Sequence, residues 1–242
     1  MNHPYYLKPK KEQNKIQIKI GFIALFFNGI VSVLSIFGGL YFLICISIVI
    51  TLSIIAPFFD IPALKKQGKL MYYSSLFVTE KEKNGIIKIH VGSLFDYVFV
   101  IDKTLSGQQR TSFILQQYLE GILNLIAVCE KENNTAVKIQ GTTYILNERT
   151  GHKIGLNSIK TNFIQKLILR FNYVNILISN SIAKRKISFP NLTTIKTFES
   201  TIEELIKRRA FIEGLNEKLK NTVHQKKVNI NLSKNENSET NS

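Results

Sequence analysis

The chain has 242 residues, 45% of them hydrophobic, and 32 lysine and arginine side chains against 17 aspartates and glutamates give it a formal net charge of +15. Its two cysteines, Cys45 in an apolar run and Cys129 in a predicted soluble helix, exclude a disulfide-stabilised secreted scaffold. The length beyond the apolar run suffices for one domain with its own core and argues against a second.

The apolar run covers residues 20–59, forty residues without a charged side chain between Lys19 and Asp60. A bilayer core of about 30 Å takes about 20 helical residues. The run therefore predicts a transmembrane hairpin of two helices, near residues 20–36 and 40–56. Gly38 and Gly39, the adjacent glycines of the run, predict the reversal between them.

Two polar or helix-breaking residues give the hairpin further detail. Pro57 lacks the backbone donor that a continuing helix needs, so we expect it to end the second helix. Asn28 lies near the middle of the first helix and is expected to find a hydrogen-bond partner on the second.

The flanks of the hairpin predict its orientation. A basic tail, residues 1–19, holds five lysines against one glutamate, and a linker, residues 60–68, begins with Asp60 and adds two lysines, followed by Lys69. Positive flanks favour the cytoplasmic side, and two passes return the chain to the side on which it started. The run is also longer than the apolar part of a signal peptide, about 7–15 residues. We therefore expect a retained hairpin in a bacterial inner membrane, with the bulk of the chain in the cytoplasm.

Residues 69–220 predict an α+β domain of about four antiparallel strands and three or four helices, before a disordered tail at 221–242. Turn signals at Asn84-Gly85 and Gly92-Ser93 separate three expected strands, and a fourth crosses Gly141. These strands are expected at residues 70–79, 86–91, 94–101 and 135–146. The main helices are expected after a capping box at Ser106, over residues 163–183, and after overlapping capping boxes at residues 200–204.

Most of the positive charge lies in one part of this domain. Residues 133–198 hold ten lysine and arginine side chains against Glu148 alone. Basic residues beside an anionic leaflet attract its headgroups, at about 1 kcal/mol each. The residues expected to bind lipid headgroups or another anion are Lys160, Lys166, Arg170, Lys184, Arg185 and Lys186. A merely solvated basic surface is the alternative, and without a zinc-finger, RNP-like or helix-turn-helix pattern nucleic acid is not an expected partner.

Motifs with a known catalytic mechanism are missing from the sequence. It has no GxxxxGKS or GxxxxGKT phosphate loop, no GxGxxG, no GxSxG elbow, no HExxH and no CxxC pair. We therefore expect no cofactor and no metal. Cys129 is expected to be an apolar filler rather than a nucleophile.

Two small groups of polar residues remain as catalytic candidates. A relay of His90, Ser93 and Asp96 can be imagined around the Gly92-Ser93 turn, although strand alternation argues against it. The other group follows the fourth strand, where loops often carry sites, and consists of Glu148, Arg149 and His152. A surface ion pair with an exposed histidine is the alternative for this group.

Three functions are consistent with these features. The first is a membrane-anchored scaffold or binding module whose basic surface contacts anionic lipid or an acidic partner. The second is a membrane-bound enzyme that acts on a lipid-linked or phosphorylated substrate near Glu148 and His152. The third is a subunit of a larger membrane complex, which would show exposed apolar surface on the 163–183 helix.

Overall fold

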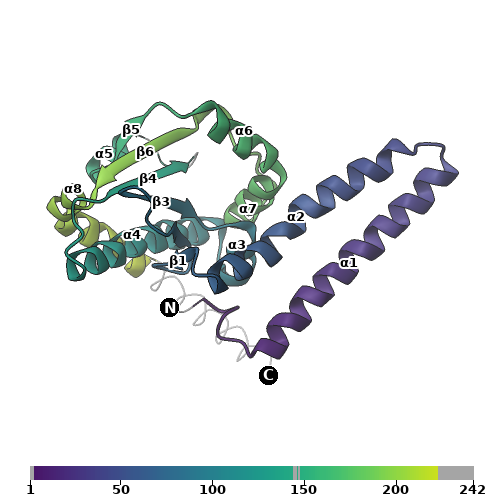
Figure 1. The fold of residues 1–242 in the computed structure, drawn as a ribbon, viewed down its shortest axis with the longest axis horizontal. Helices are drawn as coiled ribbons and strands as arrows, with labels where there is room; N and C mark the ends of the chain where they lie inside the picture. Colours follow the sequence, from purple (N-terminus) through teal and green to yellow (C-terminus); the bar gives the residue numbers. More distant parts are fainter. Residues whose placement is uncertain (1–2, 144–145, 147, 223–242) are drawn as a thin grey trace, which may run out of the picture.

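The structure is a computed structural model that describes residues 3–143, 146 and 148–222. It confirms the α+β class: a long helical hairpin projects from a domain built on a mixed sheet (Figure 1). The elements in chain order are α1 Lys10–Phe37, α2 Phe42–Lys66, β1 Leu70–Tyr72, β2 Phe77–Glu80, β3 Ile86–Val91, α3 Leu94–Val100, α4 Gly107–Lys131, β4 Lys138–Thr143, α5 Glu148–Lys153, β5 Asn157–Ile159, α6 Phe163–Phe171, α7 Tyr173–Lys184, the short 3₁₀ turn η1 Leu192–Thr194, β6 Lys196–Thr201 and α8 Ile202–Lys207.

Three of the described helices, α1, α2 and α4, are long and apolar enough to cross a membrane. The protein buries 44% of the apolar window of α4, but only 11% and 17% of those of α1 and α2. The difference arises because α4 packs on the sheet, whereas the hairpin leaves its apolar side chains facing outward. The hairpin is therefore the part that associates the chain with a membrane.

The two hairpin helices are joined by the predicted polar contact. α1 reverses into α2 through Gly38 and Gly39, and Gly39 has the positive φ of +67° that a glycine tolerates. The Ser47 hydroxyl of α2 donates to Oδ1 of Asn28 in α1 at 2.8 Å. The amide of Asn28 also donates to the Ala24 carbonyl. The prediction that Asn28 bonds across the hairpin is thus confirmed.

The prediction that Pro57 ends the second helix is wrong, because α2 continues through Pro57 and Pro62 to Lys66. A proline cannot donate to the carbonyl four residues before it, so these two prolines leave the carbonyls of Ser53 and Phe58 without their helical partners. Other helices supply the missing donors. The Asn175 amide of α7 donates to the Ser53 carbonyl at 2.8 Å, and the Gln17 amide of α1 donates to the Phe58 carbonyl at 3.0 Å.

This continuation also changes the predicted boundaries at both ends of the hairpin. Most of the expected linker, residues 60–68, is the last part of α2, and α1 begins at Lys10 inside the expected basic tail. The tail is not simply solvated, because His3 and Tyr5 are buried against the domain. A hairpin that extends beyond its apolar run gives these residues a surface on which to pack.

The sheet has six strands in the order β1-β2-β3-β4-β6-β5. The expected all-antiparallel arrangement is wrong at its centre, where β3 and β4 run parallel. A parallel pair needs a long crossover, and α3 and α4 provide it. The turn between β2 and β3 is at Asn84-Gly85, as predicted, and both residues have positive φ.

Two predicted strands have a different structure. The expected strand at residues 70–79 is the β1–β2 hairpin, which turns between Tyr72 and Phe77. The expected strand at residues 94–101 is α3. Its aromatic and β-branched residues favour a strand, but Ser93 and Asp96 form a reciprocal capping box that begins a helix. Local hydrogen bonding therefore outweighs side-chain propensity here.

The helices of the domain cover the sheet much as expected. α4 begins at the predicted capping box of Ser106 and Gln109. The predicted helix at residues 163–183 is divided at Asn172 into α6 and α7. After α8, residues 209–222 are also helical and join α4 through a buried bond between the Gln116 amide and Oδ1 of Asn216. The predicted disordered tail falls, from residue 223 onward, outside the described residues.

The hydrogen bond from Asn175 to the Ser53 carbonyl can be tested with a double-mutant cycle. Asn175→Leu removes the donor to the Ser53 carbonyl, and a buried carbonyl without a partner is expected to cost about 1–3 kcal/mol of unfolding free energy. In a Pro57→Ala background, residue 57 regains the N–H that bonds this carbonyl in a regular helix. Asn175→Leu should therefore cost at least about 1 kcal/mol less in that background.

The measurement is the unfolding of all four proteins, full length and in the same mild detergent. An equal cost of Asn175→Leu in the two backgrounds would contradict this account of the proline carbonyl.

Candidate membrane-binding site

α6 turns apolar side chains away from the protein. Phe163 and Phe171, at its two ends, are 71% and 75% exposed. Ile164, Leu167 and Ile168 lie between them and are also exposed. At about 100° per residue, these five positions share one side of the helix. An exposed apolar stripe on a short surface helix is typical of a helix that lies in a membrane interface or against a partner.

The opposite side of α6 is attached to the sheet. Gln165 accepts a hydrogen bond at 3.1 Å from the hydroxyl of Thr197, which lies in β6. The basic residues Lys166 and Arg170 are exposed and fall beside the apolar stripe, by the same helical spacing. α6 therefore has an inner polar contact, an outer apolar face and a basic flank, the distribution expected of an interfacial helix.

α7 fixes the position of α6 relative to the hairpin. The two helices meet at Asn172, and α7 contacts α2 through the bond between Asn175 and the Ser53 carbonyl. Ser53 precedes Asp60, the first charged residue after the apolar run, by seven positions. This corresponds to about 10 Å along a helix that rises about 1.5 Å per residue.

The distance between Ser53 and Asp60 along α2 bears on the depth of α6. A charged residue such as Asp60 is expected to stay at the edge of the hydrocarbon, which would place the start of α7 on the lipid side of that edge. Interfacial helices bury their apolar face about 5–10 Å into the boundary between headgroups and acyl chains. The α6–α7 junction therefore lies beside the apolar part of α2.

The six basic residues predicted to bind headgroups do not form one cluster. Lys160 precedes α6, and Lys166 and Arg170 belong to it. Lys184, Arg185 and Lys186 are exposed at the far end of α7, about 18 Å away along that helix, where Lys184 lies against Gly107 of α4. Only the first group accompanies the apolar stripe.

The catalytic candidates after β4 lie on the surface in α5. Glu148 pairs with Lys196 of β6. The hydrogen bond from Lys196, followed by one from Ser158, lowers the pKa of the Glu148 carboxyl, so the carboxylate is occupied and ionised. Arg149 and His152 are exposed. The arrangement matches the surface ion pair that was the alternative for this group.

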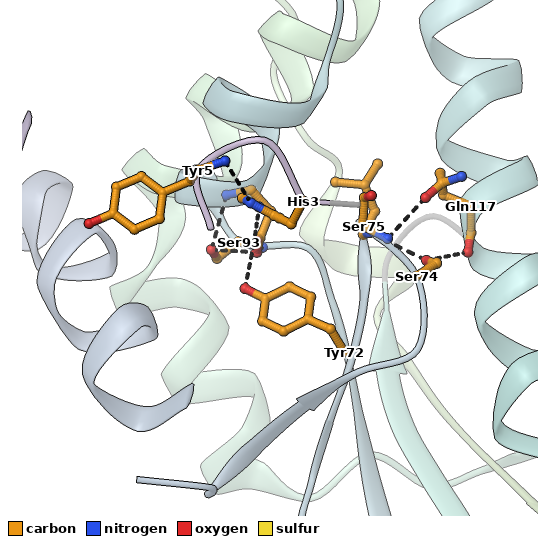
Figure 2. Close-up of polar contacts among 9 residues, drawn as sticks. His3, Tyr5, Tyr72, Ser74, Ser75, Ser93 and Gln117 are labelled. Carbon is orange, nitrogen blue, oxygen red and sulfur yellow. Dashed lines mark hydrogen bonds and ion pairs between the residues drawn. The ribbon is translucent and has the colours of Figure 1, made fainter. Parts of the chain in front are cut away.

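The imagined relay of His90, Ser93 and Asp96 is not assembled as such. His90 pairs instead with Glu80 across the β2–β3 ladder, at 2.8 Å on the exposed surface. Asp96 is buried, accepts from the Ser93 hydroxyl at 2.7 Å, and faces a different histidine, His3. Figure 2 shows His3, Ser93 and Tyr72 gathered in this cluster. Sequence spacing gave no sign of this pairing, because His3 and Asp96 are far apart along the chain.

The buried cluster around His3 fastens the N-terminal segment beneath the hairpin. The backbone N–H of Tyr5 donates to Nδ1 of His3, so this ring atom is an acceptor and a neutral imidazole carries its proton on Nε2. Nε2 lies 3.2 Å from Oδ1 of Asp96, at an angle outside that of a regular hydrogen bond. The His3 ring also stacks on Phe95 at a centroid distance of 5.3 Å.

Tyr72 completes this cluster from β1. Its hydroxyl donates to Oδ1 of Asp96 at 2.6 Å (Figure 2). Burial and the nearby Asp96 carboxylate raise the pKa of the Tyr72 phenol well above its ordinary range. The phenol therefore stays a hydrogen-bond donor over the whole neutral range. The cluster holds together polar groups from the N-terminus, β1 and α3, and this role is structural.

Two further observations limit the chemistry of the described residues. In residues 3–143, 146 and 148–222, no three His, Cys, Asp or Glu side chains come together in a way that could hold a metal ion. Cys129 lies in the main hydrophobic core, and its burial raises the pKa of the thiol to about 11, which suits the predicted apolar filler.

Comparisons of the chain with protein-family models, with curated proteins and with solved structures find no match. The site therefore has to be interpreted from its own geometry. The sequence predicted Lys166 and Arg170 and also an apolar stripe that includes Ile164, Leu167, Ile168 and Phe171, on a buried or interfacial helix at 163–183. The division of that segment into α6 and α7 was not predicted. Asn172 alone does not mark the division, because Asn175 and Asn180 lie inside α7.

Tyr72 makes the stability of the protein pH-dependent in the alkaline range. A phenol in the unfolded chain ionises near pH 10, whereas Tyr72 in the folded protein keeps its proton. The stabilisation that the neutral Tyr72 phenol contributes is therefore complete below about pH 10. As the pH rises further, this stabilisation is lost by at most about 1.4 kcal/mol of unfolding free energy per pH unit. Tyr72→Phe should reduce the slope of unfolding free energy against pH above pH 10 by up to this amount.

The comparison uses wild type and Tyr72→Phe in the same detergent, so the titration of the lysines largely cancels. Equal slopes for the two proteins between pH 10 and 11 would show that Tyr72 is not held in its neutral form.

Proposed function

We propose that this protein is a membrane-anchored binding module whose domain rests on the bilayer surface. The hairpin crosses the membrane twice, and α6 lies in the interface beside it. The observation that carries the proposal is the exposed apolar stripe of α6, held at the level of Ser53 by the Asn175 bond. Lys166 and Arg170 flank the stripe and would add attraction to anionic headgroups.

A lipid surface fits the stripe better than a partner protein does. The stripe lies next to the helices that enter the membrane, and its basic flank matches an anionic leaflet. The exposed stripe is also what a subunit of a larger membrane complex would show, and the basic flank of Lys166 and Arg170 is what favours lipid over a protein partner. The proposed location is the bacterial inner membrane with the domain in the cytoplasm, supported by the lysines before and after the apolar run.

The chain contains no tryptophan, so a single introduced indole reports on its own surroundings. Phe171→Trp places an indole on the α6 stripe. Phe189→Trp is the matched control, because Phe189 is 71% exposed but follows the far end of α7. In full-length protein reconstituted with phosphatidylglycerol and phosphatidylcholine, lipids brominated in their acyl chains should quench the Phe171→Trp indole far more strongly. An interfacial indole lies within reach of the bromines.

The emission of the Phe171→Trp variant should also shift to shorter wavelength relative to the Phe189→Trp variant. If both variants are quenched equally, or the Phe171→Trp indole emits as in water, α6 does not lie in lipid. Emission of the Phe171→Trp indole as in water would leave the apolar stripe of α6 free for a protein partner.

The orientation can be tested with introduced cysteines in a Cys45→Ala, Cys129→Ala background. His152→Cys places a thiol on the exposed surface of α5, and Leu40→Cys places one at the hairpin turn. A membrane-impermeant maleimide added to spheroplasts should label Leu40→Cys and should label His152→Cys only after lysis. The reason is that two passes put the turn outside and the domain inside. Labelling of His152→Cys in unlysed spheroplasts would reverse the proposed orientation.

A further inference from the structure

The domain contains an apolar cavity of about 280 Å³ between the sheet and the helices that cover it. Phe77, Ile139 and Phe198 line it from the sheet, and Ile122 lines it from α4. A cavity of about 150 Å³ lined by apolar side chains binds benzene, and ligand pockets begin at about 300 Å³. This cavity is therefore large enough for a substantial apolar group.

A cavity of this size is unusual in a packed core. Protein interiors normally leave few voids larger than a water molecule, and an empty apolar void lowers stability in proportion to its volume. The lining offers water few polar partners, so solvent is a poor occupant. Both points favour an apolar occupant.

The lining of the cavity includes both buried and partly exposed residues. Phe77, Ile122 and Ile139 are buried, whereas the lining residues Val91 and Leu115 are partly exposed. Val91 is the last residue of β3, and Thr143, also in the lining, is the last residue of β4. Because β3 and β4 are parallel, their ends mark the same edge of the sheet. Leu115 belongs to the first half of α4.

This open edge faces the membrane side of the domain. Two residues separate the end of β3 from the start of α3, and α3 packs against both α2 and α7 (Figure 1). The cavity therefore opens at the edge of the sheet where β3 and β4 end, beside α3 and the helices α2 and α7 that α3 contacts.

We propose that this cavity binds an acyl chain of a membrane phospholipid. This inference rests on the proposed function, because a domain held on the bilayer has lipid chains as its most concentrated apolar neighbour. The nearly all-apolar lining selects a hydrocarbon, the volume of about 280 Å³ limits the length of chain that enters, and the opening beside α3 gives access from the leaflet.

The test uses full-length protein reconstituted in vesicles that contain a phosphatidylglycerol with a photoactivatable diazirine at the end of one acyl chain. After illumination, modified peptides are identified by mass spectrometry. Peptides from three regions are compared: the hairpin, α6, and the cavity lining in α4 and β3. Hairpin labelling is the internal reference for exposure to lipid.

A pair of substitutions on α4 separates occupancy from general perturbation. Leu115→Trp puts an indole into the open end of the cavity. Leu123→Trp makes the same change at a partly buried α4 residue that packs on the core outside the cavity lining. Leu115→Trp should reduce labelling of the cavity peptides by about tenfold, as expected when a side chain fills the volume that a ligand needs. Leu123→Trp should leave that labelling unchanged, and thermal unfolding would check that both variants fold.

The outcomes separate the two proposals. Labelled α6 with unlabelled cavity peptides would overturn the lipid-binding cavity and leave the membrane-docked domain standing. Unlabelled α6 would overturn the docked domain itself. Cavity labelling that falls equally in folded Leu115→Trp and Leu123→Trp proteins would show that the lipid reaches these peptides by another route, and would also overturn the cavity proposal.

Discussion

The arrangement of hairpin and domain depends on two backbone carbonyls that proline leaves free. Pro57 and Pro62 deprive the carbonyls of Ser53 and Phe58 of their helical donors, and side chains from α7 and α1 replace those donors. An unpaired carbonyl near lipid is costly, so each replacement bond is strongly favoured. The prolines thus do not end the helix; they create the points at which α1 and the domain attach to α2.

The attachment of α7 to α2 explains why α6 lies beside the apolar part of the hairpin. The Asn175 bond places the start of α7 beside the apolar part of α2, and α6 precedes α7 directly. The cluster of His3, Tyr72 and Asp96 holds the other side, where the N-terminal segment meets β1 and α3. The hairpin and the domain are therefore joined by contacts from both ends of the hairpin as well as by the chain itself.

Local features of the sequence predicted the parts of the fold that local interactions decide. The Gly38-Gly39 reversal, the Asn84-Gly85 turn and the Ser106 capping box depend on neighbours within a few residues, and all three were correct. The predictions were wrong where contacts between residues far apart in the sequence determine the structure. The helix passes Pro57 because of a donor far along the chain, β4 pairs parallel to β3 across two helices, and His3 is buried against Asp96.

The α3 segment is a different kind of error, since its Ser93-x-x-Asp96 box was visible in the sequence and was outweighed by strand-forming residues. The candidate site was foreseen only in part. Charge marked Lys166 and Arg170, but not the division at Asn172 that turns the apolar side of α6 outward. No local pattern shows which face of an amphipathic helix a sheet will cover.

The unbroken course of α2 from the hairpin turn to Lys66 has a mechanical consequence. Without a flexible hinge, a tilt of the hairpin turns the domain by the same angle. Transmembrane helices tilt to match the thickness of the bilayer around them. With the domain docked as proposed, a thinner or thicker membrane would therefore press α6 into the leaflet or lift it out.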